Sequence, residues 1–98
     1  MNNIKNTVDS VIQKVKNYRK VTIKILVGHA DEFYMDGSYE RDDDKFVWYQ
    51  ISTDRISRET LVAKYDNYED CDVFAKQLMV EIQAAQKEHP NIVNVMMI

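Results

Sequence analysis

Residues 67–90 constrain the fold of this 98-residue chain more than any other stretch. Their apolar side chains recur at intervals of three or four, the spacing of a helix that buries one face; they are Cys71, Phe74, Ala75, Leu78, Ile82 and Ala85. Asn67 is a suitable N-cap, Asp70 stands where a capping-box acid stands, and Pro90 ends the helix. Because such a stripe needs a surface to cover, the stretch predicts a helix packed on a sheet.

Four other segments have the composition and periodicity of strands. They are residues 21–28, 45–53, 58–66 and 92–98. Segments 21–28 and 58–66 alternate, as strands with one buried face do. Segment 45–53 has aromatic side chains on both faces, with Phe46 and Trp48 on one and Tyr49 on the other. The last segment is apolar on both faces apart from Asn94, which predicts a strand covered on both sides.

A second amphipathic helix is predicted near the N-terminus, over residues 3–17. Its apolar residues again form one stripe; they are Ile4, Val8, Val11, Ile12 and Val15. The pair Asp36–Gly37 is a turn signal that predicts a hairpin over residues 33–41. The expected order is therefore α-β-(hairpin)-β-β-α-β. We expect one α+β domain over residues 1–98, with a mixed four- to five-stranded sheet and two helices packed on one face.

The composition indicates an ordinary soluble domain. The single cysteine, Cys71, cannot form an internal disulfide, which fits a reducing compartment. The N-terminus lacks the continuous apolar core of a signal peptide, and no run approaches the roughly 20 apolar residues of a membrane span. We expect a cytoplasmic protein with no membrane partner.

The net charge of −3 hides an asymmetry along the chain. Residues 1–30 carry six basic side chains and one acidic one, whereas residues 31–60 carry four basic and nine acidic ones. A protein that binds polyanions without selectivity usually has a positive net charge, so the negative net charge of this chain is atypical of such proteins. The split by sign nevertheless suggests two different binding surfaces.

The leading hypothesis concerns the acidic and aromatic segment 31–44. Acidic side chains interleaved with aromatic ones can dock on a basic protein surface; the candidate residues are Asp31, Glu32, Phe33, Tyr34, Asp36, Tyr39, Glu40, Asp42, Asp43 and Asp44. One form of this hypothesis is a small inhibitor, of the kind that phages and mobile elements encode, that blocks a nucleic-acid-binding groove. The alternative interpretation is that the segment is a solvated loop.

The alternative function uses the basic first third of the chain. Clustered lysine and arginine side chains can bind nucleic acid or a small anion such as a nucleotide; the candidates are Lys14, Lys16, Arg19, Lys20 and Lys24. The same charges also stabilise the negative end of a helix that terminates nearby. The element order α-β-β-β-α also occurs in double-stranded RNA-binding domains. Those domains place lysines at the start of the last helix, whereas this chain has Glu69, Asp70 and Asp72 there.

No catalytic set is evident. The chain has two glycines and no glycine-rich phosphate motif, and its acidic residues do not match the EF-hand spacing. We therefore expect no cofactor, no dedicated metal and no enzyme activity. A third hypothesis is a small enzyme that uses His29, which follows a glycine at a strand end. Finally, Ile98 is the last residue of an apolar strand, and exposure of that strand end could drive pairing between two copies, which makes a homodimer a further hypothesis.

Overall fold

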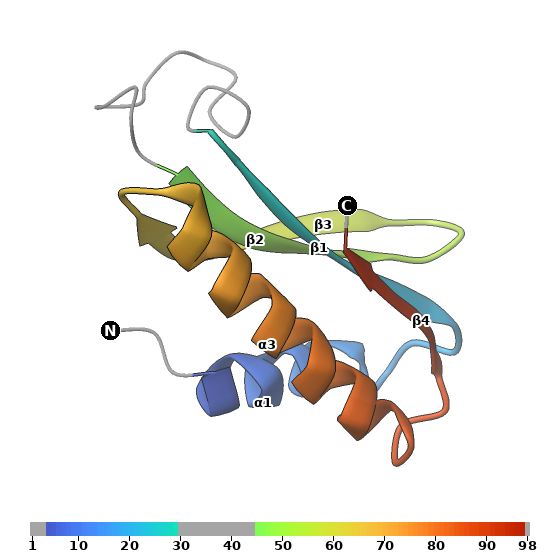
Figure 1. Ribbon diagram of the computed structural model, residues 1–98. Helices are drawn as coiled ribbons and strands as arrows, with labels where there is room; N and C mark the ends of the chain where they lie inside the picture. Colours follow the sequence, from blue (N-terminus) through green and yellow to red (C-terminus); the bar gives the residue numbers. More distant parts are fainter. Residues whose placement is uncertain (1–3, 30–44, 98) are drawn as a thin grey trace.

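The computed structural model describes residues 4–29 and 45–97 of the chain. In order, these residues form α1 (Ile4–Val15), β1 (Val21–His29), β2 (Lys45–Ser52), β3 (Ser57–Tyr65), α3 (Tyr68–Gln86) and β4 (Ile92–Met97) (Figure 1). The predicted helices and the four predicted strands are confirmed in type and order. The predicted hairpin over residues 33–41 lies outside the described residues.

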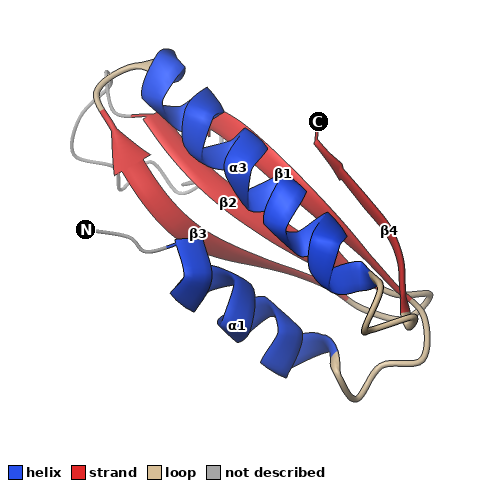
Figure 2. Ribbon diagram, turned by 60° about the horizontal axis from the view of Figure 1, so that its bottom comes forward, coloured by secondary structure: helices blue, strands red, loops and turns tan. Residues whose placement is uncertain are grey.

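The four strands form one mixed sheet in the order β3-β2-β1-β4. Strand β2 pairs antiparallel with both β1 and β3, whereas β4 pairs parallel with β1. Helix α3 leads the chain from one edge strand, β3, to the other, β4. Both helices lie on the same face of the sheet (Figure 2), which confirms the predicted α+β fold.

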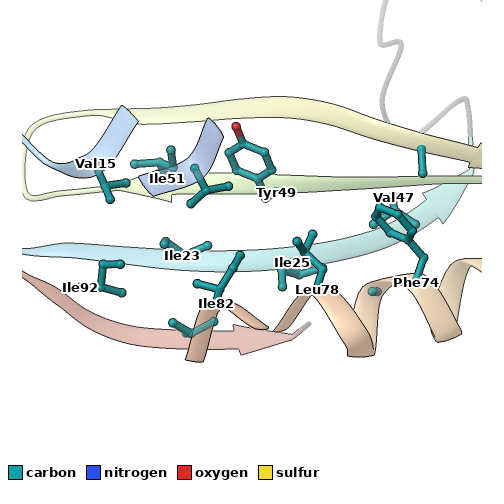
Figure 3. Packing of buried hydrophobic residues seen from close by; sticks show 14 of the residues in the cluster. Val15, Ile23, Ile25, Val47, Tyr49, Ile51, Phe74, Leu78, Ile82 and Ile92 are labelled. Atoms are coloured by element: carbon teal, nitrogen blue, oxygen red, sulfur yellow. The ribbon is translucent and has the colours of Figure 1, made fainter. Parts of the chain in front are cut away.

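The main core fills the space between the sheet and the two helices. Val15 of α1 and Leu78 and Ile82 of α3 are fully buried there against strand residues such as Ile23 and Tyr49 (Figure 3). The buried residues of α3 are those of the stripe that predicted the helix, apart from the half-buried Ala85. Burial of large apolar side chains of this kind stabilises a fold by about 1.5–3 kcal/mol each.

A second, smaller cluster lies on the other face of the sheet. Phe46 and Trp48 are buried there beside the partly buried Leu26 and Leu61. This face carries neither helix (Figure 2). The predicted placement of aromatic residues on both faces of β2 is therefore confirmed.

The prediction for the last strand is wrong in one respect. Strand β4 is an edge strand, and a register shift against β1 leaves Val93 53% exposed, so the strand is not covered on both sides. Its outer edge is instead contacted by α3. The side-chain amide of Gln86 donates to the carbonyl of Ile92 at 2.8 Å, and that of Gln83 donates to the carbonyl of Val95 at 3.5 Å.

The start of α3 is capped as the sequence predicts, with one difference. The Oδ1 atom of Asn67 accepts the backbone N–H of Asp70 at 2.8 Å. The Asp70 carboxylate accepts the side-chain amide of Asn67 at 3.2 Å, whereas in a capping box the acid accepts the backbone N–H of the cap. The two side chains therefore bond each other across the first turn of α3.

Candidate anion-binding site

A hollow of about 520 Å³ lies between two connections at one end of the sheet. One connection joins α1 to β1, and the other is the turn between β2 and β3. They lie together because the start of β1 pairs with the end of β2, Thr22 opposite Ser52. We call this feature the cationic hollow; it is lined by Asn17, Tyr18, Arg19, Lys20, Thr53, Asp54, Arg55 and Ile56.

The β2–β3 turn is held by the side chain of its first residue. The hydroxyl oxygen of Thr53 accepts the backbone N–H groups of Arg55 and Ile56 at 3.1 and 3.2 Å. The backbone N–H of Thr53 in turn donates to the carbonyl of Ile56 at 2.9 Å. A threonine that bonds its own turn in this way fixes the backbone from which Arg55 projects.

The α1–β1 connection is held from a distant part of the sequence. The side-chain amide of Asn91, just before β4, donates to the carbonyls of Val15 and Tyr18 at 2.8 and 2.9 Å. The carbonyl of Asn91 also accepts the backbone N–H of Val21 at 2.9 Å. Both walls of the cationic hollow are therefore fixed by hydrogen bonds to their backbones.

The charges around the hollow favour an anion. Arg19 and Lys20 come from one wall and Arg55 from the other, and Asp54 is the acidic residue among the lining side chains. Fully ionised, these four groups sum to +2. Tyr18 and Ile56 are half-buried and add apolar surface. A concave surface that gathers charge of one sign concentrates ligands of the opposite sign.

Of the five basic residues predicted to bind an anion, the hollow brings together Arg19 and Lys20. Lys14 instead donates to the hydroxyl oxygen of Tyr49 at 2.9 Å and to that of Thr60 at 3.3 Å. Lys16 is exposed and does not line the hollow. Lys24 lies on the opposite face of the sheet, since its neighbours in β1 are buried on the helix-covered face.

Sequence reasoning did not include Arg55 in the site. It lies 35 residues or more from the other cations along the chain, in a short turn that looks unremarkable by composition. The pairing of Thr22 with Ser52 places it beside them. Predicting this position of Arg55 from the sequence would have required knowing that β1 and β2 are antiparallel neighbours.

The other predicted sites receive no test from the structure. Segment 31–44, with all ten candidate docking residues, lies outside the described residues. His29 ends β1, and its proposed catalytic role stays a prediction. Within residues 4–29 and 45–97, no group of three or more His, Cys, Asp or Glu side chains is placed to hold a metal ion.

Cys71 is fully buried on the core side of α3. Burial is the main factor that raises the pKa of its thiol to about 11, and the nearby carboxylates Asp70 and Asp72 raise it further against the opposing effect of Lys45. The thiolate is the reactive form of cysteine, so this side chain is a poor nucleophile near neutral pH.

A second hollow, of about 540 Å³, lies between α1 and α3. Its charged lining residues are Lys5, Asp9, Glu81 and Glu88, so its net charge is negative. It does not suit an anion and provides an internal comparison for the cationic hollow.

None of the helices in the described part of the chain has the length and apolar character needed to cross a membrane. The chain matches no protein-family model, and comparisons with curated proteins and with solved structures find no significant match.

Proposed function

We propose that this protein is a non-catalytic binding protein whose cationic hollow takes an anionic ligand. The observation that carries the proposal is the convergence of Arg19, Lys20 and Arg55, from two separate connections, on one hollow. An anion bound in the hollow is attracted by the positive charge that these three side chains bring to it. The hydrogen bonds of Thr53 and Asn91 hold the two walls in place before a ligand arrives, which reduces the entropy lost on binding.

The proposal is tested by calorimetric titration with small polyanions at low ionic strength, with inorganic pyrophosphate as the first probe. The double variant Arg19→Gln/Arg55→Gln should lose at least tenfold in affinity. The matched control is Lys76→Gln/Lys87→Gln, which removes the same charge from exposed positions outside the hollow. Binding should also weaken as salt is added.

Equal loss of affinity in the two double variants would mean that overall charge, and not the hollow, attracts the anion. Absence of binding by any small polyanion at low salt would remove the proposal.

A second candidate function is docking on a basic protein surface through segment 31–44. It is favoured by the charge of that segment, which carries seven acidic side chains and one basic one. Replacing Glu40, Asp42, Asp43 and Asp44 with Gln or Asn should slow association with a basic partner and reduce its salt dependence. A protein partner retained after nuclease treatment of the lysate provides the ligand for that measurement.

The matched control removes four exposed acids elsewhere, by Glu69→Gln, Asp72→Asn, Glu81→Gln and Glu88→Gln. If the segment variant and the control bind the partner at the same rate, the docking hypothesis is wrong.

A further inference from the structure

We infer that the ligand of the cationic hollow is a nucleoside phosphate, whose base lies against Tyr18 and whose phosphate lies among Arg19, Lys20 and Arg55. This inference rests on the proposed function and names its ligand class. It depends on the size of the hollow, the placement of the cations and the position of the tyrosine ring.

The size and the charge distribution favour a compact ligand over a nucleic-acid duplex. A hollow of 520 Å³ lies within the range of about 300–1,000 Å³ that is typical of small-molecule sites. Proteins that bind a duplex spread lysines and arginines along a face to follow the phosphate backbone. Here Lys14 is engaged by Tyr49, and Lys24 lies on the other face of the sheet.

Tyr18 gives the hollow an aromatic wall that is held in place. Its half-buried side chain packs against the main core and also lines the hollow. Its backbone is fixed on both sides, because its N–H donates to the carbonyl of Val15 at 3.0 Å and its carbonyl accepts the Asn91 amide. Aromatic side chains that line a binding site can stack nucleic-acid bases, and Tyr18 is an aromatic side chain that lines the hollow.

The polar groups of the hollow suit the remainder of a nucleoside. The carboxylate of Asp54 and the amide of Asn17 line the hollow and can bond sugar hydroxyls or the edge of a base. Thr53 uses its oxygen to accept two backbone N–H groups, and its hydroxyl hydrogen can donate to the ligand. A bare phosphate would use the cations and leave Asp54 as a repulsive neighbour.

The test compares four probes by calorimetry: adenosine diphosphate, adenosine, inorganic pyrophosphate and a 20-base-pair duplex. We expect the nucleotide to bind at least tenfold more tightly than pyrophosphate or adenosine. Tyr18→Leu should remove that advantage over pyrophosphate, Tyr18→Phe should retain it, and Arg19→Gln/Arg55→Gln should weaken binding of both anions. Thermal unfolding of each variant establishes that it is folded.

A second measurement uses the unmodified chain and does not depend on the stability of a variant. The ring-proton resonances of Tyr18 should shift on addition of adenosine diphosphate and stay in place on addition of pyrophosphate. If pyrophosphate binds as tightly as the nucleotide and the Tyr18 resonances do not respond, the ligand class is wrong while anion binding at the hollow stands. Tighter binding of the duplex than of the nucleotide also overturns the ligand class, and binding of none of the anions overturns both proposals.

Discussion

The Nζ atom of Lys14 lies 2.9 Å from the hydroxyl oxygen of Tyr49 and 5.3 Å from the centre of its ring. The tyrosine is 1% exposed in the centre of β2, whereas Lys14 is an exposed residue of α1. The pair therefore ties the first helix to the sheet and satisfies the polar end of a core side chain. It also separates Lys14 from the basic residues that line the cationic hollow.

Replacing Lys14 with Met should destabilise the fold by about 1 kcal/mol, because the buried hydroxyl of Tyr49 loses a charged donor. Chemical denaturation measures this loss. The control Lys16→Met removes an exposed lysine two residues away and should have little effect. In the Tyr49→Phe background the Lys14→Met substitution should cost much less; an unchanged cost would show that the two side chains do not interact.

Asn91→Ala should destabilise the protein by roughly 2 kcal/mol. The substitution removes both donors to the carbonyls of Val15 and Tyr18, and each such bond contributes about 1 kcal/mol. The control is Asn94→Ala, at an exposed position in β4, the strand that follows Asn91. Comparable denaturation midpoints for the two variants would contradict the role assigned to Asn91.

Cys71 should make stability fall at high pH. Its folded-state pKa is raised from 9.0 to about 11, so the folded protein holds the thiol proton more tightly than the unfolded chain. The associated stability is fully present below about pH 9 and is lost as the pH rises toward 11. At about 1.4 kcal/mol per unit, a shift of about two units corresponds to a loss of roughly 3 kcal/mol.

The measurement is the difference in unfolding free energy between the natural chain and Cys71→Ala across this pH range. Burial is the main factor that raises the pKa of Tyr65, and the charges of Cys71 and Asp70 raise it further, so the difference reports the thiol together with its coupling to Tyr65. A difference that stays constant from pH 8 to pH 11 would show that the thiol titrates normally.

Gln83 and Gln86 should keep β4 from pairing with other strands. The parallel pairing of Val21 with Ile92 and of Ile23 with Val95 turns the carbonyls of Ile92 and Val95 away from β1, and these are the two carbonyls that the glutamine amides contact. Exposed edge carbonyls promote strand pairing between molecules. The variant Gln83→Ala/Gln86→Ala should therefore self-associate more than the natural chain in sedimentation experiments.

Gln77→Ala, at an exposed position on the same helix, is the control and should leave the association state unchanged. If the natural chain already forms a dimer through β4, the double variant should not increase association, and the protective role of the glutamines would be excluded.

The order of the elements could be predicted because each leaves a local signal. Apolar residues spaced three or four apart, such as Phe74 and Leu78, identify α3. The alternation of apolar and polar side chains on either side of Ile23 identifies β1. The edge position of β4 could not be predicted from composition. A strand at the centre of a sheet and an edge strand shielded by a helix are both apolar. The exposure of Val93 follows from a register shift, which the sequence does not signal.

The candidate site was predictable only in part. Arg19 and Lys20 stand out as neighbours in a basic stretch. Arg55 joins them through the antiparallel pairing of β1 with β2, and Asn91 supports the site through hydrogen bonds that span more than 70 residues of sequence. Contacts of this kind depend on the tertiary fold, and one sequence does not reveal them.

Backbone amide resonances recorded during titration with adenosine diphosphate report where on the protein the ligand binds. The shifts should be concentrated in residues 17–20 and 53–56, the two walls of the cationic hollow. Resonances around Asp9 and Glu81, in the negatively charged hollow between α1 and α3, should change little. Shifts centred on the second hollow or on the face of the sheet that carries neither helix, or no shifts at millimolar ligand, would show that the nucleotide does not bind in the cationic hollow.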